Sequence, residues 1–198
     1  PPLVYWAHEA PGPILIYFPG NGGGLHTHVG MLAYLGTTEF SIAALQYPGS
    51  PGADGAPTQA LITDLAVALY DTLRRQHPDR PIVTWGFSLG SAVAVQLAVR
   101  RPTAAVVLEA PVSAVIDIMA ERMRYVPMGL LVQDRWLSRE VIADLGAPLL
   151  ILHGERDGAV PIHHAEVLLA RAREPKSMLR VPDHGHNDLG QSGIYTTV

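Results

Sequence analysis

Three short segments of the sequence carry residue types that could together perform nucleophilic catalysis. The first is the pentapeptide GFSLG, which has the G-x-S-x-G pattern and contains Ser88. The other two are a loop that contains Asp157 and a later loop that contains His186. A serine hydroxyl is a weak nucleophile until a histidine takes its proton and a carboxylate orients that histidine. These segments therefore predict a serine nucleophile with a base and an acid.

The residues on both sides of the pentapeptide favour a nucleophilic serine more strongly than the G-x-S-x-G pattern alone. The apolar run PIVTWGF (81–87) precedes the serine, and a helix-forming run follows it over 89–100. A sharp turn between a strand and a helix exposes the hydroxyl at the end of the sheet, where the amides of the helix N-terminus favour negative charge. The alternative is a serine that only caps a helix. We predict that Ser88 is the nucleophile.

A candidate acid and a candidate base both follow the serine in the sequence. In such folds the order is serine, then a carboxylate, then histidine. The run PLLILHG leads into Glu155 and Asp157, and the run MLRVP leads into His184 and His186. Both loops follow strands, so their side chains can meet the serine at one edge of a sheet. The residues alone leave both choices open, although one base is enough for the mechanism.

The elements that must position these groups form a strand and helix alternation. Apolar runs predict strands over 14–18, 42–47, 81–87, 104–110, 147–154 and 177–182. Amphipathic runs predict helices over 26–35, 58–76, 89–100, 138–144 and 162–173. The apolar runs are continuous, as in strands covered on both faces, and the alternation predicts a parallel sheet between helices. Thr58 is predicted to cap the helix over 58–76.

The composition excludes several classes of protein. The chain has 198 residues, 48% of them hydrophobic and 16% charged, with a net charge of −4, no cysteine and one lysine, Lys176. Nucleic acid is therefore not expected as a partner, and disulfides and thiolate metal sites are excluded. No apolar run reaches the roughly 18 residues of a membrane span.

The chain begins without methionine, so it could be a fragment. The cytoplasm is favoured, and membrane association is possible only through a missing segment.

These motifs resemble the α/β-hydrolase superfamily, and more closely its lidless serine-hydrolase branch of depalmitoylases, lysophospholipid-type lipases and bacterial relatives. PGNGGG (19–24) resembles the branch's H-G-N-A-G-N segment, with Pro19 in place of histidine, and YPGSPG (47–52) resembles its Y-P/R-G-Y-G-x-S turn. GFSLG, HGERDGAVP and GHND also match. The resemblance implies that Asp157 is the acid and that His186, which precedes Asn-Asp as the family histidine does, is the base.

The segment PGNGGGLHTH (19–28) has three possible uses. A phosphate cradle would need a nearby lysine and another glycine register, and a metal site at His26 and His28 would need further ligands. We therefore expect neither, and no metal or cofactor elsewhere. Enzymes of this kind pair the amide after the serine with an amide from the loop after the first central strand. The resemblance thus implies an oxyanion hole formed by the backbone amides of Asn21 and Leu89.

The longest interruption of the alternation is the segment 111–137, here called the cap segment. Its large apolar residues are Met119, Met123, Tyr125, Met128, Leu130 and Leu131. Methionine and aromatic side chains make adaptable apolar walls, so these residues, the first three above all, could line a pocket for an acyl group. Equally, they could bury a short cap helix against the sheet. The segment is too short for a large lid, so we expect an open site.

Together these observations predict an α/β-hydrolase fold in a single domain over 1–198. We expect a mostly parallel sheet of about six to seven strands with helices on both faces and a minimal cap. Relatives generally carry more strands before the first predicted strand and a helix after the histidine loop, so this chain is either trimmed or bare at its sheet edges. The resemblance implies a serine hydrolase of carboxylic esters or thioesters. The alternatives are an amidase or peptidase with the same triad and a non-catalytic binding protein.

Overall fold

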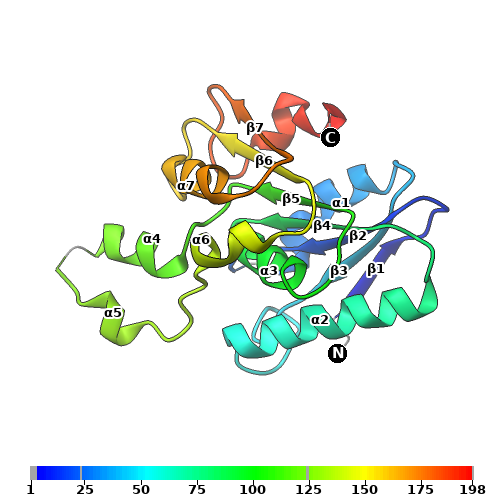
Figure 1. Cartoon of the computed structure of the whole chain (residues 1–198), viewed down its shortest axis with the longest axis horizontal. Coiled ribbons are helices and arrows are strands. Elements are labelled where there is room, and N and C mark those ends of the chain that lie inside the picture. The colour runs from blue at the N-terminus through cyan, green and yellow to red at the C-terminus, as the bar shows by residue number, and fades with distance from the viewer. Residues whose placement is uncertain (1–3, 23, 124, 198) are drawn as a thin grey trace.

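The computed structural model describes residues 4–22, 24–123 and 125–197, and within them the chain forms a seven-stranded sheet between helices (Figure 1). The strands are β1 (Val4–His8), β2 (Ile14–Phe18), β3 (Ser41–Leu45), β4 (Ile82–Phe87), β5 (Ala105–Glu109), β6 (Leu149–Gly154) and β7 (Lys176–Val181). Their spatial order is β1-β3-β2-β4-β5-β6-β7. Strand β1 is antiparallel to β3, and strands β2 to β7 are parallel to one another. The predicted mostly parallel sheet is confirmed.

Helices occupy all five predicted ranges, and two further ones lie in the cap segment, for which no range was predicted. They are α1 (Val29–Leu35), α2 (Gln59–Gln76), α3 (Leu89–Ala98), α4 (Val115–Arg122), α5 (Met128–Leu131), α6 (Ser138–Val141) and α7 (His163–Arg171). Short 3₁₀ turns cover Leu25–His28, Ile142–Asp144, Leu189–Ser192 and Ile194–Thr197. The side chain of Thr58 accepts a hydrogen bond from the amide of Leu61, so the predicted cap of α2 is present. None of the described helices is long and apolar enough to cross a membrane.

Two of the predicted helices are divided. The range 26–35 becomes a 3₁₀ turn followed by α1, and the range 138–144 becomes α6 followed by a 3₁₀ turn. The break before α1 falls at His28, whose φ of −108° and ψ of 9° leave the helical region. These breaks shorten both helices but keep them on the predicted connections between strands.

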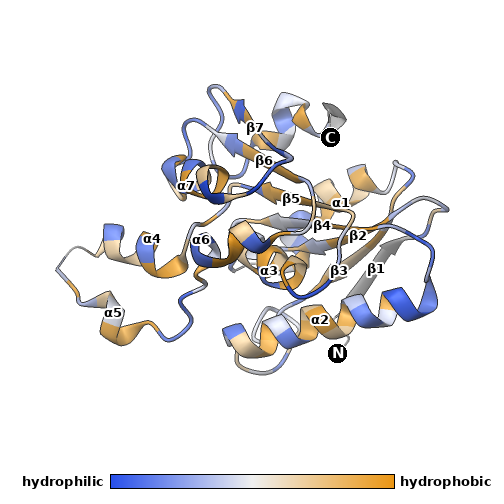
Figure 2. Cartoon of the chain, in the orientation of Figure 1, coloured by the Kyte–Doolittle hydropathy of each residue, from blue (hydrophilic) through white to orange (hydrophobic). Residues whose placement is uncertain are grey.

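The central strands are buried on both faces, which explains their continuous apolar sequence. In β2, Ile14, Ile16 and Phe18 pack with residues of α2 and α3 in one hydrophobic cluster. Leu15 and Tyr17, which point the other way, pack with residues of α1 in a second cluster. Figure 2 shows the central strands of the sheet coloured largely as hydrophobic. The sheet therefore forms a stiff layer, and the loops at the carboxyl ends of its strands start from fixed positions.

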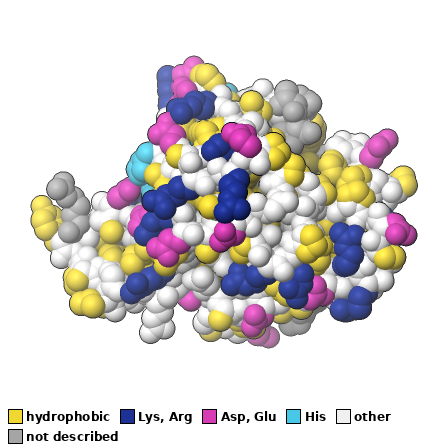
Figure 3. Space-filling model, viewed as in Figure 1, with side chains coloured by type: hydrophobic (Ala, Val, Ile, Leu, Met, Phe, Trp, Pro, Cys, Tyr) yellow, Lys and Arg dark blue, Asp and Glu magenta, His cyan; other side chains and the backbone are white. Residues whose placement is uncertain are grey.

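The cap segment projects from this layer. Its helices α4 and α5 lie beside the body of the molecule and extend away from it (Figure 1). Helix α4 has no buried residue, and in α5 only Met128 is buried. The large exposed hydrophobic residues of the segment are Met123, Tyr125, Val126, Leu130 and Leu131. Figure 3 shows hydrophobic side chains at the end of this projection. The cap segment is thus much less packed than the sheet.

Candidate active site

Ser88 lies in a sharp turn between β4 and α3 that two close glycines make possible. Its φ of 53° and ψ of −119° are values that L-residues rarely adopt. A Cβ on Gly86 would lie 2.2 Å from the carbonyl oxygen of Gly90, and a Cβ on Gly90 would lie 2.0 Å from that of Phe18. The amide of Ser88 donates to the carbonyl oxygen of Glu109 at 2.9 Å. The turn is therefore fixed to both neighbouring strands.

Side chains from three loops meet in a continuous hydrogen-bonded row. Nε2 of His186 lies 3.1 Å from Oγ of Ser88, and Nδ1 of His186 lies 2.7 Å from Oδ2 of Asp157. An ionised carboxylate can only accept, so Nδ1 carries the proton of the neutral imidazole. Nε2 is then free to accept from the serine hydroxyl. The row has the polarity that removes a proton from Ser88.

Asp157 is held as a carboxylate by its own loop. Its Oδ1 accepts hydrogen bonds from the amides of Ala159 at 2.8 Å and Val160 at 2.7 Å. Burial acts to raise the pKa of Asp157, but the hydrogen bonds from His186 and from these amides outweigh burial and lower it below the usual range. Glu155, the other candidate, is exposed on the same loop. The structure brings Asp157 to the imidazole and leaves Glu155 in solvent.

His153 supports this loop from beneath and was missed by the sequence analysis. The residue is fully buried in β6, and its Nε2–H donates to the carbonyl oxygen of Val160 at 2.9 Å. The same nitrogen lies 3.5 Å from Oδ2 of Asp157. Burial lowers the pKa of His153, against the raising effects of its bond to Val160 and of the Asp157 charge. A histidine inside an apolar strand that leads into the acid loop is the signal that could have identified it.

The two histidines of the last loop have different surroundings. Nδ1–H of His184 donates to the carbonyl oxygen of Pro182 at 2.7 Å, and its own carbonyl oxygen accepts from the amide of Arg156 at 2.9 Å. A Cβ on Gly154 would lie 2.3 Å from that same carbonyl oxygen. His184 thus joins its loop to the end of β6, whereas His186 reaches Ser88.

The two amides proposed for an oxyanion hole lie on segments that contact each other. Leu89 is the first residue of α3, so its amide has no acceptor within the helix. The loop of Asn21 is held by Tyr47, whose hydroxyl donates to the carbonyl oxygen of Pro19 at 2.9 Å. Asn21 and Leu89 both line one cavity with Ser88. The described geometry is compatible with the predicted pair of donors.

Two cavities, each of about 870 Å³, meet at Ser88. Both are lined by Asn21, Gly22, Ser88 and His186. The first, here called the cap pocket, lies beneath the cap segment and has mostly apolar walls. These include Val112, Val115, Ile118, Met119, Met123, Leu131, Val132 and Trp136. The predicted residues Met119 and Met123 therefore line a cavity that opens on the serine.

Tyr125 was predicted to line the same pocket, and the structure places it elsewhere. Its side chain is 98% exposed, and it is not among the residues of the cap pocket. It lies in the turn between α4 and α5. The neighbouring Leu130 is also exposed, whereas Met128 is buried and Leu131 reaches the pocket. The direction of each side chain depends on this turn, which the sequence pattern does not specify.

The second cavity, here called the tyrosine pocket, has polar and aromatic walls that sequence analysis missed. It includes Tyr17, His28, Glu109 and Tyr195. Oε1 of Glu109 accepts from the hydroxyl of Tyr195 at 2.6 Å, and Nδ1 of His28 is hydrogen-bonded to the hydroxyl of Tyr17 at 2.9 Å. Burial raises the pKa of Glu109 against the lowering effect of its hydrogen bonds from Tyr195 and Trp85. The position of Glu109 after an apolar run was a usable signal.

The fold and this geometry agree with the comparison to known families. Residues 13–131 match the family model described as the alpha/beta hydrolase fold. The chain belongs to the α/β-hydrolase family. The turn at Ser88, between a strand and a helix, is the one expected of this family. The fold class predicted from the sequence is confirmed.

Relatives of this α/β hydrolase include uncharacterized proteins and named enzymes. An uncharacterized protein of Mycobacterium tuberculosis is 35% identical over 188 residues, covering 93% of this chain and 67% of that protein. The lysophosphatidylserine lipase ABHD12 of Danio rerio is 28% identical over 187 residues, covering 84% of this chain and 49% of that protein. The chain spans about half to two thirds of these relatives.

A solved structure shows the same fold at low sequence identity. The esterase domain of a Rhodothermus marinus protein has a TM-score of 0.67 and 18% identity, covering 92% of this chain and 81% of that one. The family and its esterase- and lipase-like members support hydrolase activity for this chain.

Proposed function

We propose that this α/β hydrolase cleaves carboxylic esters or thioesters through an acyl-enzyme formed on Ser88. The observation that carries the proposal is the row of hydrogen bonds from Ser88 through His186 to Asp157, with distances of 3.1 and 2.7 Å. No group in this row needs to move far to transfer a proton. In this proposal Ser88 is the nucleophile, His186 the base and Asp157 the acid.

The first half of the reaction forms the acyl-enzyme. Oγ of Ser88 bonds to the substrate carbonyl carbon as its proton passes to Nε2 of His186. The imidazolium that forms is stabilised by the carboxylate of Asp157, which the amides of its loop keep ionised. When the tetrahedral intermediate collapses, the bond to the alkoxide or thiolate breaks, and the leaving group takes the proton from His186.

The second half repeats these steps with water. His186 takes a proton from water as the water oxygen bonds to the acyl carbon. Collapse of the second intermediate releases the carboxylic acid and returns the proton to Ser88. In both halves the amides of Asn21 and Leu89 donate to the negative oxygen, and in other hydrolases each such donor contributes about 3 kcal/mol.

The two cavities suggest where the halves of the substrate bind. The apolar walls of the cap pocket, with Met119 and Met123, suit the acyl chain. The tyrosine pocket offers hydroxyl, imidazole and carboxyl groups to the leaving alcohol or thiol. This assignment follows from the rule that buried polar groups need polar partners.

A panel of p-nitrophenyl esters and acyl thioesters of increasing chain length tests the proposal, with a p-nitroanilide as the amide comparison. We expect ester or thioester turnover that is lost in Ser88→Ala. Preference for the anilide would instead favour the amidase or peptidase alternative. Absence of turnover on all substrates in a well-folded protein would contradict the proposal.

The pair His186→Ala and His184→Ala tests the identity of the base. Because only His186 reaches Ser88, we expect His186→Ala to lose nearly all turnover. His184→Ala should keep most of it, because its side chain contacts its own loop. The reverse result would show that the base is assigned to the wrong histidine.

A further inference from the structure

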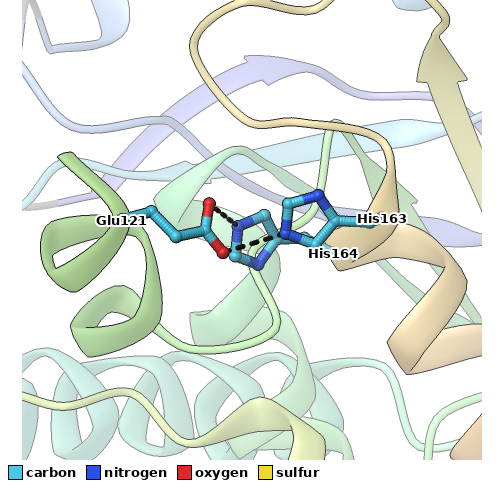
Figure 4. A group of neighbouring side chains, drawn as sticks. All are labelled: Glu121, His163 and His164. Carbon is cyan, nitrogen blue, oxygen red and sulfur yellow. Dashed lines mark hydrogen bonds and ion pairs between the residues drawn. The ribbon is translucent and has the colours of Figure 1, made fainter. Parts of the chain in front are cut away.

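Three side chains that the proposed mechanism does not use meet where the cap segment contacts the body. Glu121 comes from α4, and His163 and His164 come from the first turn of α7 (Figure 4). Nε2 of His163 lies 2.9 Å from Oε1 of Glu121, and Nε2 of His164 lies 3.5 Å from Oε2. All three ligand atoms lie within 4.8 Å of one another.

His164 is oriented toward this point by its surroundings. It is only 1% exposed, and its Nδ1 lies 2.7 Å from the hydroxyl oxygen of Ser113. That hydroxyl also lies 3.4 Å from Oδ2 of Asp117, to which it donates, so it accepts from Nδ1–H of His164. In this tautomer the buried Nε2 carries a lone pair, and Oε2 of Glu121 lies 3.5 Å from it. A second hydrogen bond that fixes the tautomer is typical of histidines that bind metals.

From this arrangement we propose that Glu121, His163 and His164 form a binding site for a divalent transition metal, with zinc as the best-suited ion. Two imidazoles and one carboxylate favour zinc over magnesium and calcium, which prefer oxygen ligands. Ligand atoms around tetrahedral zinc lie about 3.4 Å apart, since each is about 2.0–2.1 Å from the ion. The two separations from Glu121, 2.9 Å to His163 and 3.5 Å to His164, are close to that value.

The site is open enough for an ion to enter. Glu121 and His163 have side chains that are 44% and 50% exposed, whereas His164 is buried. Zinc would therefore enter from the solvent side, and water would complete its coordination. On binding, zinc displaces the proton from Nε2 of His163, which passes to solvent. Nδ1 of His163 takes up a proton from solvent, so the imidazole stays neutral.

The ion would join α4 directly to α7. Near this point Arg122 at the end of α4 donates a hydrogen bond to the carbonyl oxygen of Ala159, in the loop before α7, at 2.6 Å. Helix α4 also carries Met119, which lines the cap pocket. Zinc would fix this helix to α7 and so hold one wall of the pocket in place. This inference goes beyond the proposed function and does not depend on it.

Calorimetric titration of the EDTA-treated, desalted chain with zinc chloride tests the site. We expect one zinc per chain with a micromolar or lower Kd. Loss of a ligand in His163→Ala or Glu121→Gln should weaken binding at least about tenfold, since even the loss of a group that only hydrogen-bonds to a ligand has an effect of about 10–100-fold. Both residues are half exposed, so both variants should fold, and circular dichroism verifies this.

Two further histidine variants serve as controls. His26→Ala removes an exposed histidine away from the cluster, and His186→Ala removes the imidazole beside Ser88. Both should keep the wild-type zinc affinity. The proposal is overturned if wild type binds no zinc, if His163→Ala or Glu121→Gln binds as tightly as wild type, or if binding is lost in His186→Ala.

Hydrogen exchange tests the tie between the helices. Zinc should slow exchange of the α4 amides in wild type and should leave exchange in His163→Ala unchanged at the same concentration. Equal exchange of α4 with and without bound zinc in wild type would overturn the proposed link to α7.

Discussion

The loops that carry Ser88, Asp157 and His186, here called the catalytic loops, differ sharply in packing from the cap segment. The loops of Ser88 and Asp157 follow the buried strands β4 and β6, and the loop of His186 follows the edge strand β7. Each loop is held by hydrogen bonds or by backbone contacts too close for a side chain. The cap segment holds α4, which has no buried residue, and a turn whose tyrosine, Tyr125, is 98% exposed. One region is therefore rigid, and the other is loosely attached.

This difference separates two tasks of the proposed enzyme. Proton transfer over hydrogen-bond distances requires fixed geometry, because small displacements greatly reduce the rate. Accommodation of an acyl chain requires only apolar walls that can adapt, and the methionines of α4 provide them. Changes in the catalytic loops should therefore affect rate and stability strongly, whereas changes in the cap segment should affect substrate preference.

The largest expected effect is on the rate, in the comparison of Asp157→Asn with Glu155→Gln. Asp157 accepts from Nδ1 of His186, whereas Glu155 on the same loop is exposed. Loss of the orienting carboxylate should lower kcat by about 10⁴-fold, as in other triads. Glu155→Gln should stay within about twofold of wild type. Ester-hydrolysis kinetics measure kcat of both variants. Equal losses of kcat would contradict the assignment of Asp157, rather than Glu155, as the acid.

A matched pair of glycine substitutions compares the stability of the two regions. A Cβ on Gly90 would lie 2.0 Å from the carbonyl oxygen of Phe18, so Gly90→Ala should lower the free energy of unfolding by about 3 kcal/mol or more. Gly129 in α5 has nothing within 4 Å of such a Cβ. Gly129→Ala should raise the free energy of unfolding by up to about 1 kcal/mol. Urea unfolding measures both, and a similar cost at the two sites would contradict the packing difference.

Within the cap segment, Met119→Ala and Tyr125→Ala should differ in their effect on chain-length preference. Met119 lines the cap pocket, and Tyr125 does not. We expect Met119→Ala to lower kcat/KM about tenfold for long acyl esters and little for acetate, because a lost apolar contact costs about 1–3 kcal/mol. Tyr125→Ala should leave both values near wild type. A larger loss in Tyr125→Ala would place the acyl chain outside the described cavity.

The smallest expected effect concerns the pH dependence of stability at Glu109. Burial raises the pKa of this carboxyl, against the lowering effect of its hydrogen bonds from Tyr195 and Trp85. Because its pKa is raised in the folded state, protonated Glu109 contributes to the free energy of unfolding. This contribution is complete below the usual range of glutamate and is lost as the pH rises through the folded pKa.

The variant Glu109→Gln cannot ionise at this position. Its free energy of unfolding should therefore not fall with pH for this reason. Its free energy of unfolding should therefore improve relative to wild type as the pH rises above the usual range of glutamate. Urea unfolding across the pH series measures this difference, with Glu155→Gln as the exposed control. A difference that stays constant with pH would show that Glu109 does not titrate differently on folding.

The same difference in packing explains what the sequence could predict. All six predicted strands are present within two residues of their expected ends. Strands β2 to β6 are largely buried, and burial on both faces requires continuous apolar runs. The turn at Ser88 was predictable because only glycine fits at Gly86 and Gly90. The residue types left the acid and the base open, and the resemblance to a family indicated Asp157 and His186.

Features that depend on distant contacts could not be predicted. Tyr125 is exposed and does not line the cap pocket, and no periodic pattern encodes the side-chain directions in such a turn. The bond between Tyr195 and Glu109 joins residues 86 positions apart in the chain. The meeting of Glu121 with His163 and His164 depends on how α4 lies against α7. A single sequence carries little information on such packing. The residues proposed for catalysis were therefore easier to predict than the residues that line the pockets.

Covalent labelling by a fluorophosphonate tests the central proposal most directly, because the reagent reacts only with a serine that is activated as a nucleophile. Mass spectrometry of the labelled wild-type chain should find one adduct, on the peptide that contains Ser88. The adduct should be absent from Ser88→Ala and strongly reduced in His186→Ala. A well-folded wild-type chain that stays unlabelled, or one labelled at another serine, would contradict the proposal that Ser88 is the nucleophile.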